Sequence, residues 1–100
     1  MKIIDKTEKL VSFEHFAEQH DLTLEMHERH GKYTLAGRYY CYFVNGEVSE
    51  PGVLVGTVGN GQTKEAAIQD YAHKLKGQLL VIDAYKSSRR SIQCPNEWAE

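Results

Sequence analysis

Residues 56–75 have the sequence GTVGNGQTKEAAIQDYAHKL, a glycine-rich stretch that runs directly into a pattern typical of a capped, amphipathic helix. Thr63 is placed to accept a hydrogen bond from a free backbone N–H of the first turn, and Glu65 puts negative charge near the positive end of the helix dipole. Gly77 follows the pattern as a natural stop. Apolar residues recur on one face, at Ile68, Tyr71, Ala72 and Leu75. This face must pack against another layer of the fold.

Length and composition indicate one domain. The chain has 100 residues, of which 41% are hydrophobic, and this is enough for one modest core. We therefore expect a single domain over residues 1–100. The N-terminal stretch MKIIDKTEKLVSFEHF interrupts its short apolar runs with charges, which fits neither a secretory signal nor a membrane span. Cys41 and Cys94 are too few to indicate a disulfide scaffold. A cytoplasmic protein with free thiols and no membrane contact follows.

The N-terminal half is predicted to hold one helix and two strands. Ser12 can cap a short helix over residues 13–20. Residues 22–27 alternate apolar and polar side chains, which is the signature of a strand with one wet face. A turn at residues 30–32 precedes the stretch 33–44, which is rich in aromatic residues that favour strands. We expect the whole of that stretch to form one long strand.

The C-terminal half is predicted to complete an α+β fold. Turn-forming residues at 45–52 lead to a third strand at 53–58, and residues 59–61 are expected to be a loop before the main helix. Residues 79–85 and 91–94 are predicted to be a further strand and an edge strand. The expected architecture is an antiparallel sheet of three to five strands with two helices on one face. Its element order is α-β-β-β-α followed by a C-terminal strand or hairpin.

The aromatic strand is the candidate interaction surface. Its side chains alternate across the sheet, so that Tyr39, Cys41 and Phe43 share one face and Tyr40 and Tyr42 share the other. If both helices cover one face, the rings on the other face stay exposed, and a protein partner or a second copy would remove them from water. The predicted interaction residues are Tyr39, Tyr40, Tyr42 and Phe43.

A basic stretch offers a second candidate surface, because charge is uneven along the chain. The net charge is −2, which gives no general attraction to nucleic acid, but residues 64–90 hold six Lys or Arg against three Asp or Glu. The predicted anion or nucleic-acid contacts are Lys64, Lys74, Lys76, Lys86, Arg89 and Arg90.

From residue 12 to residue 75 the chain resembles the double-stranded RNA-binding domain. The resemblance rests on the element order and on Gly59, Gly61, Thr63, Lys64 and Ala66-Ala67. It implies a sheet with both helices on one face and a role in RNA binding. In that family a cluster of lysines at the start of the last helix holds phosphates, whereas here Lys64 is followed by Glu65 and two alanines.

Two further resemblances concern the helix start and the whole chain. The joint at residues 59–75 is similar to that of HicB-like antitoxin domains, in which a G-x-T-x-x-E-A pattern starts the helix, although Ala66 stands where their glutamate usually lies. The whole chain also resembles small uncharacterised proteins of phages and prophages. This implies an accessory role, including inhibition of a host defence system.

Three kinds of chemical site are considered, and none is expected. His27 and His30 are three apart in a strand and turn, so they do not converge on one metal ion. Cys41 lies mid-strand, where a small buried thiol is usual and a reactive one is not. The GNGQT loop precedes a helix but lacks the complete phosphate-binding patterns. We expect no enzyme activity, no metal and no cofactor, and interpret the chain as a binding protein acting through protein–protein contacts, with nucleic-acid binding as the alternative.

Overall fold

The structure is a computed structural model that describes residues 1–2 and 10–99. The expectation about the N-terminal stretch falls partly on residues 3–9, outside the described residues. The elements, in chain order, are α1 (Phe13–Gln19), β1 (Leu24–Glu28), the 3₁₀ helix η1 (Gly31–Ala36), β2 (Tyr39–Phe43), β3 (Gly46–Glu50), β4 (Val53–Val55), β5 (Gly59–Gly61), α2 (Lys64–Leu75), β6 (Leu79–Ile82) and β7 (Arg90–Gln93). The predicted α+β class is confirmed. Within the described part of the chain, no helix has the length and apolar character needed to cross a bilayer.

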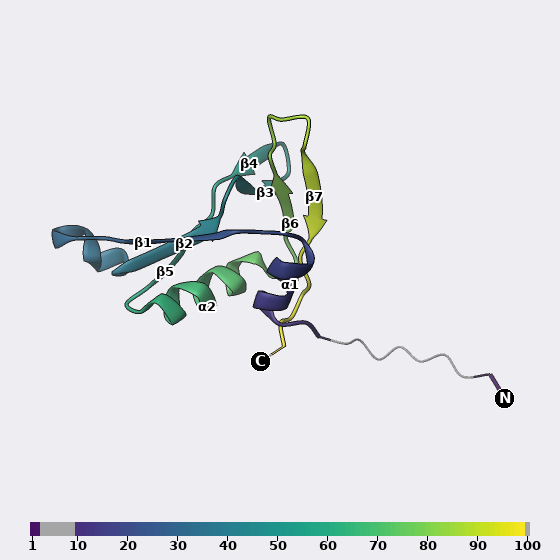
Figure 1. The fold of residues 1–100 in the computed structure, drawn as a ribbon, viewed down its shortest axis with the longest axis horizontal. Helices are drawn as coiled ribbons and strands as arrows, with labels where there is room; N and C mark the ends of the chain where they lie inside the picture. The colour runs from purple at the N-terminus through teal and green to yellow at the C-terminus, as the bar shows by residue number, and fades with distance from the viewer. Residues whose placement is uncertain (3–9, 100) are drawn as a thin grey trace.

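The strands divide between two antiparallel sheets rather than one. The order is β1-β2-β5 in the first sheet and β4-β3-β6-β7 in the second. Figure 1 shows that the strands of the two sheets run in different directions. One long hairpin is common to both sheets: β2 pairs with β5 in the first sheet, and their continuations β3 and β4 pair in the second. The strand direction changes at Asn45, which has a positive φ of 60°. The hairpin of β6 and β7 joins the second sheet by pairing with β3.

Helix α2 packs on the first sheet, against β5 (Figure 1). The close approach is possible because two of the three residues of β5 are glycines. A Cβ added at Gly59 would lie 2.2 Å from the carbonyl oxygen of Ala67, and one at Gly61 would lie 2.4 Å from the amide nitrogen of the same residue. Only glycine permits this approach. The predicted cap is confirmed, since Thr63 accepts a hydrogen bond from the N–H of Ala66 at 3.0 Å.

The core lies between the two helices and the sheets. Phe13 of α1 stacks on Phe43 of β2 with ring centroids 5.2 Å apart, and Phe43 in turn meets Tyr71 of α2 edge-on. The backbone N–H of Phe43 donates to the Tyr71 hydroxyl oxygen at 3.0 Å, which satisfies a buried donor at a position of β2 that β5 does not reach. Leu75 and Leu80 are fully buried in the same cluster. Both helices thus cover the same side of the first sheet.

Several predicted element boundaries are wrong. The strand expected at 53–58 ends at Val55, and the strand expected at 79–85 ends at Ile82. The expected long strand over 33–44 breaks, because residues 31–36 form η1 and only residues 39–43 are strand. The expected connection at 45–52 contains strand β3, and the expected loop at 59–61 is strand β5. Strand β5 pairs with β2, and β3 pairs with β6 as well as with the adjacent β4. The pairings with β2 and β6 join segments that are distant in the sequence, and local propensity does not reveal them.

Candidate protein-interaction face

The hairpin of β1 and β2 brings two pairs of side chains to the sheet face that points away from α2. Glu25 lies opposite Tyr42, and His27 lies opposite Tyr40. Because side chains alternate across a strand, all four project from one face, while Cys41 projects from the other into the core. The aromatic face, as used below, consists of Glu25, His27, Arg29, Tyr40 and Tyr42.

Three rings of the aromatic face are nearly parallel. The His27 and Tyr40 ring centroids are 4.8 Å apart with planes at 11°, and the His27 and Tyr42 centroids are 5.5 Å apart with planes at 15°. The two tyrosine centroids are 6.4 Å apart. Offset ring pairs at such separations contribute about 0.5–1.5 kcal/mol beyond the area that they bury. The rings therefore hold one another in place before any partner binds.

Arg29 extends the ring cluster at one end. Its Cζ lies 4.4 Å from the Tyr40 ring centroid, which is a cation–π contact, and its Nη1 donates to the carbonyl oxygen of Gly37 at 3.0 Å. These two contacts fix the guanidinium beside the tyrosine, on the wall of a shallow hollow that Glu28 and His30 complete. Tyrosine and arginine are, with tryptophan, the side chains enriched in the energetic centres of protein interfaces.

A short polar network crosses the aromatic face. The Nε2 atom of His27 lies 2.8 Å from Oε1 of Glu25 and 3.1 Å from the hydroxyl oxygen of Tyr42. Partial burial, reinforced by the negative charge of Glu25, raises the pKa of Tyr42 above its usual value. The side chains of His27 and Glu25 remain 35% and 45% exposed. The network is therefore ordered and still open to a partner.

The predicted interaction residues separate into two groups. Tyr40 and Tyr42 belong to the half-exposed aromatic face. Phe43 is fully buried against Phe13, so its assignment to an interaction surface is wrong in this fold. Tyr39 is half-buried on the helix side of the sheet, where Arg38 Cζ lies 5.5 Å from its ring centroid.

Sequence reasoning missed Glu25, His27 and Arg29 as members of the face. The alternation over 22–27 already placed Glu25 and His27 on the wet side of a strand. Their position beside Tyr40 and Tyr42 depends on the register between β1 and β2, which a ten-residue connection containing η1 does not specify locally.

The predicted basic residues are not brought together. Lys64 starts α2, whereas residues 86–90 lie in and beside the connection from β6 to β7, at the far end of the molecule (Figure 1). Most of these cations are already engaged. Lys74 Nζ lies 2.8 Å from Asp70 Oδ2, and Lys76 Nζ lies 3.2 Å from Glu97 Oε2. Lys86 is 3.9 Å from Asp83, Arg89 donates to the carbonyl oxygen of Ala84, and Arg90 donates to that of Asp21.

The GNGQT segment does not form a cradle for an anion. Gly59 and Gly61 pair with β2, and the intervening N–H of Asn60 donates to Asp70 Oδ2 at 2.8 Å. Burial opposes ionisation of Asp70, but the hydrogen bonds from Lys74 and from this N–H outweigh it and hold the pKa of the carboxyl below its usual value. The Asn60 N–H is therefore already bound by a carboxylate and is not free for an anion.

The two thiols are unsuited to nucleophilic chemistry. Cys41 and Cys94 are free, and they are 0% and 1% exposed. Burial raises the pKa of each thiol to about 11, so that the thiolate is scarce near neutral pH. Among the described residues, no group of three or more His, Cys, Asp or Glu side chains is placed to hold a metal ion.

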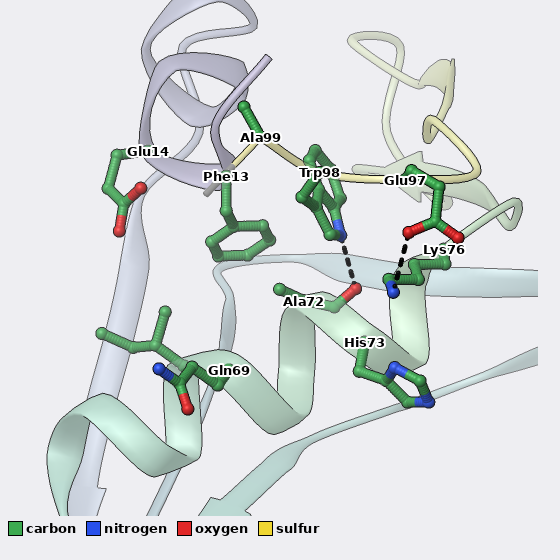
Figure 2. Close-up of a pocket in the computed structure, with 10 residues that line it drawn as sticks. Phe13, Glu14, Gln69, Ala72, His73, Lys76, Glu97, Trp98 and Ala99 are labelled. Atoms are coloured by element: carbon green, nitrogen blue, oxygen red, sulfur yellow. Dashed lines mark hydrogen bonds and ion pairs between the residues drawn. The ribbon is translucent and has the colours of Figure 1, made fainter. Parts of the chain in front are cut away.

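A second concavity lies between α1, α2 and the C-terminal segment. Its volume is about 640 Å³, and Figure 2 shows its lining, with the rings of Phe13 and Trp98 side by side. The indole N–H of Trp98 donates to the carbonyl oxygen of Ala72 at 2.7 Å. The polar side chains of Glu14, Gln69 and His73 point in different directions (Figure 2). The other two charged side chains of the lining, Lys76 and Glu97, are paired with each other. The groove is therefore a packing interface that Trp98 fills.

Comparison of the chain with protein-family models, with curated proteins and with solved structures finds no match.

Proposed function

We propose that this chain is a non-enzymatic binding protein that contacts protein partners through the aromatic face. The observation that carries the proposal is the ordered, half-exposed cluster of His27, Tyr40 and Tyr42 on the sheet side that neither helix covers. Preorganised rings lose little conformational entropy on association. The carboxylate of Glu25 and the guanidinium of Arg29 supply a charged rim on both sides of the rings.

The setting that we propose, on resemblance alone, is that of a cytoplasmic accessory protein of a phage or prophage. An inhibitor of a host defence system is the specific role in that setting. The burial of both thiols and the engaged glycine segment support binding over catalysis.

The test is affinity capture from a bacterial lysate with three forms of the protein. These are the wild type, the double variant Tyr40→Ser/Tyr42→Ser, and Tyr85→Ser as a matched control. Tyr85 is 89% exposed and lies in the connection between β6 and β7 of the second sheet. A partner that supports the proposal is retained by the wild type and the control and is lost from the double variant. Circular dichroism establishes that all three are folded. Equal retention by all three forms would remove the aromatic face from the proposal.

Nucleic-acid binding is the second candidate, and one observation favours it. Arg38 and Lys64 both flank the Tyr39 ring, with Lys64 Nζ 5.9 Å from its centroid, so two cations meet an aromatic side chain where α2 begins. A duplex RNA bound there would lose affinity steeply with added salt, and Lys64→Ala would reduce the slope by about one. Binding that is absent at low salt would eliminate this candidate.

A further inference from the structure

The two edges of the first sheet differ. On the β5 edge, the outward N–H of Asn60 is bound by Asp70, and the carbonyl oxygen of Val58 accepts from Lys74 Nζ at 3.0 Å. On the β1 edge, no strand of the described part of the chain pairs with residues 24–28 beyond β2. An open edge presents backbone donors and acceptors to any strand of matching register.

The hydrogen bonds at the two ends of the hairpin tell which residues of β1 face outward. The N–H of Arg29 donates to the carbonyl oxygen of Arg38 at 2.7 Å, and the N–H of Val44 donates to that of Thr23 at 2.9 Å. In an antiparallel pair, residues alternate between facing the partner strand and facing away from it. Residues 23, 25, 27 and 29 therefore direct their backbone groups to β2. Leu24, Met26 and Glu28 direct theirs to the open edge.

The outward-facing residues of β1 are arranged symmetrically about Met26, so the edge can pair with an identical edge. When a second β1 approaches antiparallel with the two-fold axis at Met26, each outward residue meets an outward residue. Met26 faces Met26 of the partner subunit, and Leu24 faces Glu28 of the partner subunit. All three outward positions of each strand then exchange backbone hydrogen bonds, and all five residues of β1 are paired.

The side chains agree with the same register. It places Glu25 of each subunit opposite His27 of the partner subunit, so the contact occurs twice. These are non-hydrogen-bonded pairs, in which the side chains lie closest, and each brings a carboxylate to a ring with an N–H donor. Moving the axis to Glu25 would instead put the two Glu25 carboxylates opposite each other, which is unfavourable. On the inner face, the two half-buried Met26 side chains meet at the axis.

We propose that the protein forms a two-fold dimer in which β1 pairs antiparallel with β1 of a second copy, centred on Met26. The two three-stranded sheets then become one six-stranded sheet, and the aromatic faces of both copies form one continuous surface. This inference names one partner for the protein–protein contacts proposed above and rests on that proposal. It concerns the sheet edge, however, and the aromatic face can fail its own test independently.

Sedimentation equilibrium over a concentration series tests the dimer directly. The wild type is expected at twice 11.4 kDa at high concentration. Met26→Pro is expected to be monomeric, because proline lacks the outward N–H while leaving every bond to β2 intact. Met26→Val is the matched control, because it also loses the thioether but keeps the N–H, and it should still dimerise. A monomeric wild type, or a Met26→Pro variant that dimerises as well as Met26→Val, would overturn the proposal.

Charge exchange tests the register and does not depend on proline. His27→Glu puts two pairs of carboxylates face to face, and Glu25→Lys removes both carboxylates, so each variant alone should dimerise roughly tenfold more weakly or worse. An equimolar mixture of the two should form a heterodimer. In it, the two carboxylates of the His27→Glu subunit face the histidine and the introduced lysine of the Glu25→Lys subunit. The double variant Glu25→Lys/His27→Glu should also dimerise. Mixing without recovery would overturn the register.

The outcomes separate the two proposals. If the Tyr40→Ser/Tyr42→Ser variant still dimerises and no lysate partner depends on those rings, the dimer through β1 stands and the aromatic face is removed from the proposed function. A monomeric wild type that still captures a Tyr40- and Tyr42-dependent partner does the reverse.

Discussion

Cys41, Tyr71 and Cys94 are three ionisable groups of the core, and each is almost completely buried. Burial disfavours the charged form of an acid, and it raises the pKa of the two thiols from 9.0 to about 11 and that of Tyr71 from 10.0 to about 12. The folded protein therefore holds these protons at pH values where the unfolded chain releases them.

The sign of the resulting pH dependence follows from proton linkage. Because the native state binds more protons than the unfolded state, the free energy of unfolding decreases as pH rises above about 9 and continues to fall until the folded pKa values near 11 and 12 are passed. We predict a melting temperature that is level from pH 7 to 8.5 and falls progressively above pH 9. Native thiol labelling at pH 8 should be slow for both cysteines and become rapid in denaturant. A thiol that reacts at once in the native protein would contradict this burial.

At the scale of elements, the contact between α2 and β5 decides how the first sheet is covered. Gly59→Ala would bring a Cβ within 2.2 Å of the Ala67 carbonyl oxygen and within 2.4 Å of Tyr71 Cβ, so α2 must shift. We predict a loss of stability of roughly 1–3 kcal/mol or more, measured by urea unfolding. Gly56→Ala is the control, because nothing lies within 4 Å of the added atom, and it should be nearly neutral. Equal effects of the two changes would mean that the close approach does not matter.

The same segment illustrates what sequence can and cannot predict. The cap at Thr63 and the apolar face of α2 are local patterns, and both are confirmed. The GNG segment is a strand although glycine and asparagine disfavour strands, because the helix requires a bare backbone beneath it. That requirement exists only once α2 has folded back, so no local pattern reveals it.

The candidate face follows the same division. The alternation in β2 correctly separated Tyr40 and Tyr42 from Cys41 and Phe43, because a period of two is a property of the strand itself. Which of the two sets is covered depends on where the helices lie. The addition of Glu25 and His27 depends on the hairpin register. Sequence therefore predicted the two faces and left their environments to tertiary contacts.

At the scale of the whole molecule, the C-terminal segment ties the second sheet back to the first helix. In the segment after β7, the carbonyl oxygen of Pro95 accepts a hydrogen bond from the N–H of Gly77. Further along, the N–H of Ala99 donates to the carbonyl oxygen of Val11 at 2.8 Å. Between these two contacts, Trp98 packs edge-on against Phe13 and Phe16 with centroid separations of 5.2 Å and 5.1 Å. One side chain thus joins both helices to the segment that follows the second sheet.

Removing that side chain should loosen the molecule as a whole rather than one element. We predict that Trp98→Ala lowers the free energy of unfolding by about 3 kcal/mol, because it removes ring contacts with α1 together with the hydrogen bond to Ala72. Trp98→Phe keeps one aromatic ring and loses the fused second ring together with the N–H donor, so its effect should be smaller than that of Trp98→Ala. Hydrogen exchange should then be faster in α1 and in the segment after β7 together for Trp98→Ala, because Trp98 joins the two. Faster exchange confined to the last residues would instead indicate that α1 is held by Phe43 and Tyr71 alone.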